Sequence, residues 1–237
     1  TGSHNAAEYN GLKTVIDGDS LFAEGIEEIK KFVISKKYVS GRGTLRHVDI
    51  STDYIQRILD DIDISVSRMP KIVMDCGNGS AGEIAPRLFK ELGCNLVTIF
   101  SEIDGRFPNH HPDPSQPINL EDLVRKVKQE NADIGFAFDG DGDRLGIVDA
   151  TGSIIWPDKQ LMLLAIDVLS RNKGSNIIYD VKCTKHLKSI IESNHGKSLM
   201  WKTGHSFIKQ KMNEVGAPLA GEMSGHIFFK ERWYGFD

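Results

Sequence analysis

The sequence has few cysteines, and none of them is placed for a disulfide framework or a paired metal motif. The three thiols, Cys76, Cys94 and Cys183, are widely spaced, and one would remain after any pairing. Cysteines in a reducing compartment stay unpaired, so reduced core thiols are expected here. We therefore predict a cytoplasmic protein.

Long hydrophobic runs and basic clusters are also missing. The longest apolar run covers residues 161–166, far short of the roughly 20 residues that span a bilayer, and the first residues show no basic-then-apolar signal pattern. The formal net charge is -4 and the pI is near 6.1, with no run of Lys or Arg that would form a local basic patch. The composition argues against a membrane or nucleic-acid partner.

The chain does have the composition of a globular protein. Its 237 residues, 40% hydrophobic and 26% charged, are enough for one large or two ordinary domains. Apolar residues recur at helical spacing over residues 20–37 and again over residues 51–64, which predicts two amphipathic helices. A Gly-Arg-Gly turn separates them, so we place a domain boundary near residue 48.

Beyond that boundary, strand and helix patterns alternate. The expected elements are a strand at 71–75, a helix ending at Leu92, a strand at 95–100, a helix at 158–169, a strand at 176–181, a helix at 184–193, a strand at 198–201 and a helix at 206–215. Alternation of this kind predicts sheets covered by helices. The expected fold class is α/β, in consecutive domains at 1–48, 49–152 and 153–237. Recurrence of the pattern suggests duplication, although no residue-level repeat is convincing.

Three aspartates alternate with glycines between two apolar strands, at Asp139, Asp141 and Asp143. Three carboxylates at this spacing would repel one another unless a cation lay among them, and the glycines allow the tight backbone that brings their oxygens together. Oxygen ligands without Cys or His select a hard ion, which favours Mg²⁺. The alternative is a polar hairpin tip. An EF-hand is excluded because Arg144 stands where its loop needs Gly and Ala150 where it needs Glu.

Two other polar segments each allow two interpretations. The turn at 77–82, Gly-Asn-Gly-Ser-Ala-Gly, precedes a helix and could bind phosphate, but it lacks P-loop and G-x-G-x-x-G order, so we interpret it as a packing turn. The proline-containing segment at 107–114 must be a loop. Its adjacent His110 and His111, with Asp113, could bind zinc, but we favour a rigid polar loop because neighbouring histidines project in different directions.

A third polar segment, at 221–226, has the composition of a sugar-binding turn. Glu222 can accept hydrogen bonds from two neighbouring sugar hydroxyls, Ser224 can donate or accept one, and the glycines let a ring approach the backbone. Lys182 and the segment at 203–206 are expected at nearby strand ends, where loops converge. Taken alone, however, a turn of this composition is more often structural, with His226 as a satisfied core histidine.

Taken together, these motifs resemble those of the α-D-phosphohexomutases. The first residues, Thr-Gly-Ser-His-Asn-Ala-Ala-Glu-Tyr-Asn-Gly-Leu-Lys, are similar to the active-site serine loop of that family, with Ala6 where the family has Pro. Gly-Ser-His is also what a cleaved affinity tag leaves behind, but the continuation and the aspartate loop argue against a tag. With Met223 at the centre of its sugar loop, the chain looks most like the bacterial phosphomannomutase/phosphoglucomutase branch.

The resemblance implies a fold and an extent. Each domain would be a mixed sheet flanked by helices, of the phosphohexomutase type. Residues 1–48 would be the end of domain 1 with the phosphoserine loop, residues 49–152 domain 2 with the metal loop, and residues 153–237 an incomplete domain 3 with the sugar loop. The chain would lack most of domain 1, the end of domain 3 and all of domain 4. On its own, this fragment would therefore be a poor catalyst.

The resemblance also implies a reaction. The protein would interconvert hexose 1-phosphate and hexose 6-phosphate, of mannose, glucose or both, through a phosphoserine and a 1,6-bisphosphate. One Mg²⁺ per active site and hexose 1,6-bisphosphate as activator are the expected cofactors, and a monomer is expected. The implied catalytic residues are Ser3, His4, Lys13, Arg144 and His226; the metal ligands are Ser3, Asp139, Asp141 and Asp143; the substrate contacts are Lys182, Gly204, His205, Glu222, Met223, Ser224, Gly225 and His226.

Some roles and two other functions stay open. Lys13 would be the general acid/base, Arg144 would orient phosphate or hold the sugar, and His226 would assist proton transfer or only bind; a solvated charge is the alternative for Lys13 and Arg144. A metal-dependent sugar phosphatase would also use an aspartate loop, although its usual pattern has Thr or Val where Asp143 stands. A non-catalytic sugar-binding fragment would bind hexose without regard to Mg²⁺ or Ser3.

Overall fold

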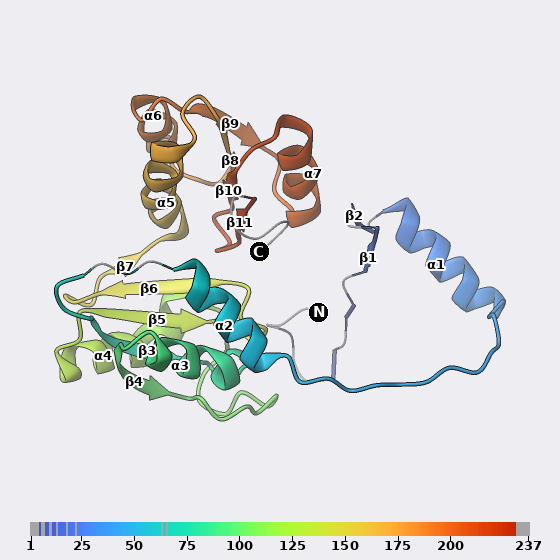
Figure 1. The fold of residues 1–237 in the computed structure, drawn as a ribbon, viewed down its shortest axis with the longest axis horizontal. Helices are drawn as coiled ribbons and strands as arrows, with labels where there is room; N and C mark the ends of the chain where they lie inside the picture. Colours follow the sequence, from blue (N-terminus) through green and yellow to red (C-terminus); the bar gives the residue numbers. More distant parts are fainter. Residues whose placement is uncertain are drawn as a thin grey trace.

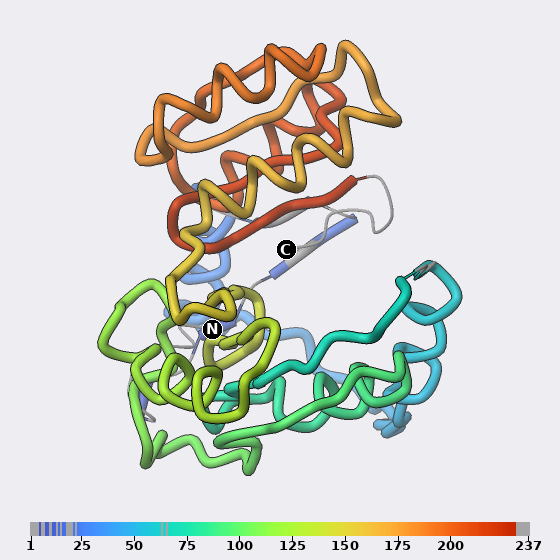
Figure 2. Tube along the Cα trace, turned by 90° about the vertical axis from the view of Figure 1, so that its left-hand side faces the viewer, coloured from blue at the N-terminus to red at the C-terminus, as the bar shows by residue number. Residues whose placement is uncertain are grey.

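The computed structural model describes residues 5, 8, 9, 11, 12, 14–17, 19–21, 23–62, 64 and 66–230. Its main body consists of two sheets, each flanked by helices, which form the two lobes of Figures 1 and 2. Within the described residues, no helix combines the length and the apolar character that crossing a membrane requires. The predicted α/β fold class is confirmed.

The first sheet is mixed and has five strands in the order β4-β3-β5-β6-β7. β3 runs parallel to both β4 and β5, whereas β6 is antiparallel to β5 and β7 is antiparallel to β6. The strands are β3 (Lys71–Asp75), β4 (Asn95–Ile99), β5 (Ile134–Phe138), β6 (Leu145–Asp149) and β7 (Ile154–Ile155). The flanking helices are α2 (Ser51–Asp61), α3 (Ala81–Glu91), the 3₁₀ turn η1 (Pro117–Leu120) and α4 (Glu121–Glu130).

The second sheet is also mixed, in the order β11-β10-β8-β9. β8 is parallel to β9 and β10, and β11 is antiparallel to β10. The strands are β8 (Asn176–Asp180), β9 (Lys197–Trp201), β10 (Leu219–Gly221) and β11 (Ile227–Phe229). The helices are α5 (Pro157–Arg171), α6 (His186–Ser193) and α7 (His205–Val215).

Alternation along β8 explains the three-layer packing of the second lobe. Ile177 and Tyr179 lie in one buried cluster with the apolar residues of α5 and α6, whereas Ile178 lies in another with Ile208 and Met212 of α7. Successive side chains of a strand point to opposite faces, so a central strand covered on both sides is apolar throughout. Helices therefore cover both faces of this sheet (Figure 1).

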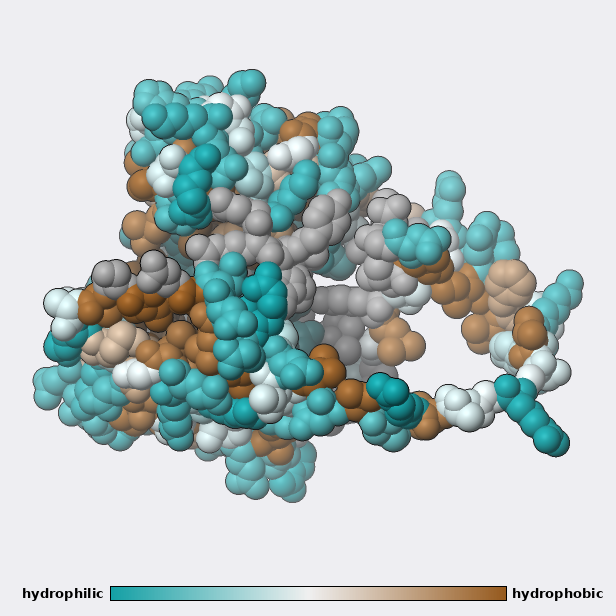
Figure 3. All heavy atoms as spheres, in the orientation of Figure 1, coloured by the Kyte–Doolittle hydropathy of each residue, from teal (hydrophilic) through white to brown (hydrophobic). Residues whose placement is uncertain are grey.

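The structure shortens both predicted N-terminal helices. α1 runs from Glu24 to Ser35 instead of over 20–37, because Ser20 belongs to the small hairpin of β1 (Val15–Ile16) and β2 (Asp19–Ser20), and Lys36 takes a left-handed conformation that ends the helix. α2 stops at Asp61 instead of Ile64 because Ile62 is extended. α1 is amphipathic, as expected, but within the part of the chain that the structure describes none of its side chains is buried. Figure 3 shows hydrophobic side chains gathered along it.

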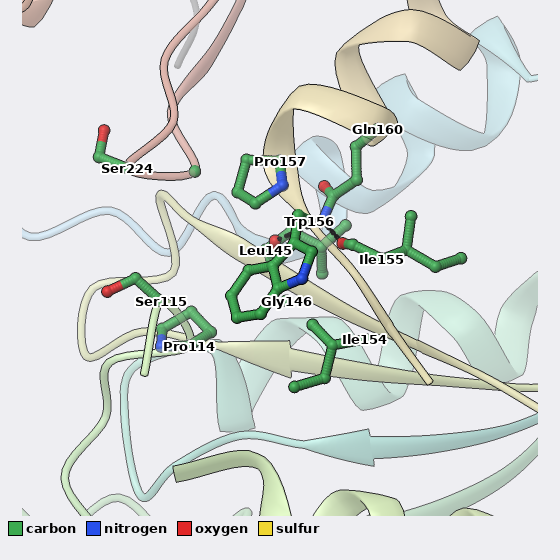
Figure 4. A pocket seen from close by; sticks show the side chains of 11 residues that line it. Pro114, Ser115, Leu145, Gly146, Ile154, Ile155, Trp156, Pro157, Gln160 and Ser224 are labelled. Atoms are coloured by element: carbon green, nitrogen blue, oxygen red, sulfur yellow. Dashed lines mark hydrogen bonds between the residues drawn. The ribbon is translucent and has the colours of Figure 1, made fainter. Parts of the chain in front are cut away.

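A short connection joins the two lobes. β7 lies beyond the expected domain boundary at 152, yet it pairs with β6 of the first sheet, and α5 begins two residues later. Gln160, in the first turn and a half of α5, is 3% exposed, and its Nε2 donates to the carbonyl oxygens of Ile155 at 2.8 Å and Leu145 at 3.2 Å. The amide thus anchors the start of the second lobe to the last two strands of the first (Figure 4).

The three cysteines are free thiols, as expected. Burial raises the pKa of Cys76 to about 12, with a smaller contribution from the charge of Asp75, and burial likewise raises the pKa of Cys183. Because the thiolate is the reactive form, these two side chains are inert at neutral pH.

Candidate active site and metal loop

The aspartate loop joins β5 to β6, as the sequence predicts. One carboxylate oxygen from each of Asp139, Asp141 and Asp143 can be chosen so that all three lie within 4.8 Å of one another. Asp139 is fully buried, Asp143 is half-buried and Asp141 is exposed. Gly142 has a φ of +76°, which gives the turn a conformation that residues with a Cβ rarely adopt.

These residues fit a hard divalent cation. The cluster supplies carboxylate oxygen atoms alone, and one side of it is open to solvent at the exposed Asp141. Asp139 is held in place by Arg144, whose backbone N–H donates to Oδ1 at 3.0 Å and whose Nε donates to Oδ2 at 3.1 Å. Asp139, Asp141 and Asp143 would therefore hold Mg²⁺, and the hydrogen bonds from Arg144 would fix the orientation of the Asp139 carboxylate.

Arg144 is not a solvated charge, because it is only 7% exposed. Beside Asp139, its guanidinium approaches Asp113 at 3.3 Å and Asp143 at 3.9 Å. Its aliphatic stem packs against the segment at 222–226, since a Cβ placed on Gly225 would meet the Arg144 Cβ at 3.4 Å. Arg144 therefore lies between the metal loop and the segment at 222–226.

The segment at 222–226 is the turn of the β10–β11 hairpin. It is closed by the Glu222 N–H donating to the His226 carbonyl at 2.9 Å and by the Gly225 N–H donating to the Glu222 carbonyl at 3.1 Å. Gly225 has a φ of +103°. The carboxylate of Glu222 is buried and accepts the Gly204 N–H at 2.5 Å and the Ser224 hydroxyl at 3.5 Å. Glu222 therefore holds two predicted substrate segments together.

His226 turns from this hairpin towards the metal loop. Its Nδ1 lies 3.8 Å from Asp143 Oδ2, its ring stacks on Phe228, and the ring of His205 is 6.4 Å away. Ser224 and Gly225 line a small cavity with the 114–115 and 145–146 segments, which Figure 4 shows from close by. The structure therefore places Arg144, His205 and His226 near one another, where the aspartate loop meets the turn at 222–226.

Lys182 is exposed on the loop after β8. Its backbone N–H is tied to Asp180, a residue that sequence reasoning did not select. Ser3, His4, Lys13 and Ala6 lie outside the described residues, so their roles and the meeting of Ser3 with the metal loop stay predictions.

Asp180 is fully buried at the end of β8. Its Oδ1 accepts the Lys182 N–H at 3.2 Å, the Cys183 thiol at 3.2 Å and the Met223 N–H at 3.3 Å. Its Oδ2 accepts the Thr203 hydroxyl at 3.0 Å. The available signal was the apolar run that ends in aspartate, Asn-Ile-Ile-Tyr-Asp, which repeats the pattern of Lys-Ile-Val-Met-Asp at 71–75.

The glycine-rich turn at 77–82 packs against the metal loop. The Ser80 N–H donates to the Gly140 carbonyl at 3.0 Å, and a Cβ on Gly79 would lie 2.7 Å from that same oxygen. The packing interpretation accounts for these contacts, because glycine alone allows the two backbones to approach so closely.

The proline-containing segment at 107–114 contains no helix or strand. The His110 Nε2 is hydrogen-bonded to the Asp75 carboxylate at 2.9 Å, and its Nδ1 is hydrogen-bonded to the His111 carbonyl at 2.9 Å. Both ring nitrogens therefore already have protein partners. Among the described residues, the three aspartates form the one cluster with metal-ligand geometry. The rigid polar loop is thus favoured over the zinc site.

The pair of His110 and Asp75 predicts a pH-dependent stability. Burial alone would lower the pKa of His110, but the hydrogen bond and charge of Asp75, the His111 carbonyl and the charge of Asp122 together raise it. A raised pKa in the folded state stabilises the fold below the unfolded value of about 6.5, and this contribution is lost as the pH rises through the folded value. We expect the unfolding free energy from urea titrations to fall as the pH rises above about 6.5.

The control for this prediction is His110→Gln, which keeps a donor but does not titrate near neutrality. Its unfolding free energy should be flatter over the same pH range. An equal pH slope in both proteins would show that His110 is not the responsible group.

Comparison with known proteins places these features in a family. The family model for phosphoglucomutase/phosphomannomutase α/β/α domain II matches residues 52–152, and the model for domain III matches residues 156–237. A phosphomannomutase/phosphoglucomutase from Pseudomonas aeruginosa is 56% identical over 237 residues, and a phosphoglucomutase from Neisseria meningitidis is 51% identical over 239 residues. The whole of this chain corresponds to 51% and 52% of those proteins.

A solved structure agrees with the sequence comparisons. A phosphoglucomutase/phosphomannomutase family protein from Burkholderia thailandensis superposes with a TM-score of 0.95 at 55% identity, over all of this chain and 51% of the other. The chain therefore spans about half the length of the relatives it matches.

Proposed function

Because the chain belongs to the phosphoglucomutase/phosphomannomutase family, we propose that the whole protein interconverts the 1-phosphates and 6-phosphates of mannose, glucose or both. This proposal is carried by the observation that the aspartate loop lies against the hairpin turn at 222–226. His226 lies near Asp143, and Gly225 packs against Arg144. A charge-stabilising loop thus lies beside a turn suited to sugar hydroxyls.

In the proposed reaction, the phosphoryl group of phospho-Ser3 passes to O6 of a hexose 1-phosphate. The bond from phosphorus to the serine Oγ breaks as the bond to O6 forms, which gives the 1,6-bisphosphate. Lys13 takes the proton from the attacking hydroxyl and returns one to the serine oxygen. After the bisphosphate has turned, the phosphoryl group on O1 passes back to Ser3 and leaves hexose 6-phosphate.

The chain's own residues would align this transfer. Phosphoryl transfer needs alignment and electrostatic stabilisation more than covalent help. Mg²⁺ bound to Asp139, Asp141 and Asp143, with the oxygen of Ser3, would spread the charge of the transferring group. Arg144 fixes the orientation of Asp139, and His4 and His226 would assist proton transfer or bind phosphate.

The hairpin turn at 222–226 would bind the hydroxyls of the sugar. An ionised carboxylate has about four acceptor sites, so Glu222 can accept a sugar hydroxyl while it holds the Gly204 N–H. Lys182 and His205 would contact the sugar phosphate. Met223, Ser224 and Gly225 complete the proposed contacts, with the glycine allowing the ring to approach the backbone. We also propose a cytoplasmic monomer activated by hexose 1,6-bisphosphate.

The test incubates the whole protein with Mg²⁺, a trace of glucose 1,6-bisphosphate and either glucose 1-phosphate or mannose 1-phosphate. We expect formation of the 6-phosphates at initial rates that chelation of Mg²⁺ or Ser3→Ala reduces to background. Release of inorganic phosphate without isomerisation would favour a phosphatase. Hexose binding without turnover, unaffected by Mg²⁺ or Ser3→Ala, would favour a binding fragment. Turnover of glucosamine 1-phosphate alone would contradict the proposed substrates.

A further inference from the structure

The two sheets share a feature at the ends of their central strands. β3 lies between β4 and β5, and β8 lies between β9 and β10, with parallel neighbours on both sides in each case. Each of these strands ends in an aspartate that is 0% exposed, Asp75 in β3 and Asp180 in β8. The two carboxylates therefore occupy equivalent places in the two lobes.

Their hydrogen bonds are also equivalent. In each aspartate, Oδ1 accepts the backbone N–H two residues later, from Gly77 at 2.8 Å and from Lys182 at 3.2 Å. In each, Oδ2 accepts from a side chain of a distant loop, His110 Nε2 at 2.9 Å or the Thr203 hydroxyl at 3.0 Å. One carboxylate thus fixes the loop that follows its own strand and a second loop from elsewhere in the chain.

The loops fixed by Asp75 support the metal loop. The turn that begins at Gly77 continues to Ser80, which donates to the Gly140 carbonyl. Gly77 itself packs against Pro112 and the Phe138 carbonyl, since a Cβ there would lie 3.2 and 3.3 Å from them. The turn after β3 therefore lies against the hairpin that carries the three aspartates. The loop that contains His110 reaches the same hairpin through Asp113, which lies 3.3 Å from Arg144.

The loops fixed by Asp180 carry the proposed sugar contacts. Lys182 lies two residues after Asp180, in the loop after β8, and Thr203 precedes Gly204 and His205 at the start of α7. A further donor to Asp180, the Met223 N–H at 3.3 Å, belongs to the hairpin turn. Among the described residues, all segments that hold predicted substrate contacts thus meet at this carboxylate.

We propose that Asp75 and Asp180 are positioning residues that divide the site between them, Asp75 setting the metal loop and Asp180 setting the sugar-binding loops. Neither touches the reacting atoms; each acts through the backbone that it holds. Removing a buried carboxylate leaves several donors unsatisfied and releases the loops from one another. The inference rests on the proposed function for its kinetic readout and on the proposed sugar site for its glucose 6-phosphate titration, but neither binding titration requires turnover.

The experiment compares Asp75→Ala and Asp180→Ala in the whole protein. For Asp75→Ala we expect Mn²⁺ affinity, titrated by calorimetry without substrate, to fall by about 10–100-fold, with little change in the affinity for glucose 6-phosphate. For Asp180→Ala we expect the KM for glucose 1-phosphate and the dissociation constant of glucose 6-phosphate to rise on the order of tenfold or more, with Mn²⁺ affinity unchanged.

Asp75→Asn and Asp180→Asn provide the rescue arm. Asparagine keeps an acceptor oxygen for the backbone N–H groups, and its NH₂ can donate to the neutral His110 ring or to the Thr203 oxygen. Both variants should recover most of the lost affinity and keep the same division of effects. If an alanine variant does not fold, the two asparagine variants are compared instead. Their smaller losses of affinity must then fall on Mn²⁺ for Asp75→Asn and on glucose 6-phosphate for Asp180→Asn.

Asp149→Ala is the matched control. Asp149 also ends a strand and accepts the N–H groups of Thr151 and Ser153, but it pairs with Ile134 at the opposite end of the sheet. It should change neither affinity. The proposal is overturned if Asp75→Ala and Asp180→Ala weaken both ligands equally, or weaken neither. Absence of mutase activity in the unmodified protein would instead contradict the proposed function, and the two binding titrations would still decide this inference.

Discussion

Replacing Asp139 by alanine is expected to lower the free energy of unfolding by about 3–5 kcal/mol. The reason is Arg144, which is 7% exposed and donates two hydrogen bonds to this carboxylate, one from its backbone N–H and one from its Nε. Without Asp139, the Arg144 backbone N–H loses this acceptor, and the buried guanidinium keeps Asp113 at 3.3 Å and Asp143 at 3.9 Å as its charged neighbours. Urea titrations in the presence of a chelator measure the loss without any contribution from a bound ion.

Asp141→Ala is the control from the same cluster. Asp141 is exposed, so its removal should change the unfolding free energy by no more than about 0.5 kcal/mol, or stabilise the metal-free protein slightly by relieving repulsion between carboxylates. If both variants lose equal stability, the buried pair with Arg144 is not what distinguishes the two positions.

Gly79→Ala is expected to displace the metal loop. The new Cβ would lie 2.7 Å from the Gly140 carbonyl oxygen and 3.0 Å from the Asp139 carbonyl oxygen. These are backbone atoms that cannot rotate away, so one of the two turns must move. We expect a loss of about 1–3 kcal/mol in unfolding free energy and a fall in Mn²⁺ affinity of about 10–100-fold, measured by urea titration and calorimetry.

Gly105→Ala provides the comparison for this prediction. A Cβ at Gly105 would meet no atom within 4 Å, so the same chemical change should leave stability and Mn²⁺ affinity near their original values. An unchanged Mn²⁺ affinity in Gly79→Ala would show that the glycine-rich turn does not set the geometry of the metal loop.

The sequence predicts the longer elements because their periodicity extends over enough residues. The strand at 71–75 and the helices that became α5 and α7 are found within one or two residues of their expected bounds. β7, with two residues, and β10 and β11, with three each, are too short to show a period of two. Their pairing is decided by the sheet that they join, which a local pattern does not reveal.

The candidate site divides in a similar way. The aspartate cluster and the turn at 222–226 are recognisable because their functional residues are close in sequence. The bond from Met223 to Asp180 spans 43 positions and the pair of Arg144 and Asp113 spans 31, so no local motif contains either. Glu222 was predicted from its capacity to accept sugar hydroxyls, yet its bond to the Gly204 N–H depends on how β10 lies beside β8.

The anchoring of α5 by Gln160 has a consequence for how a hexose bisphosphate would be handled. Because the Ile155 and Leu145 carbonyls both accept from this one amide, the start of α5 is fastened to the edge of the first sheet. This attachment would limit changes in the spacing between the aspartate loop and the turn at 222–226. Under the proposed function, a bisphosphate whose two ends react in succession would have to reverse its orientation between an aspartate loop and a turn whose separation this contact would limit.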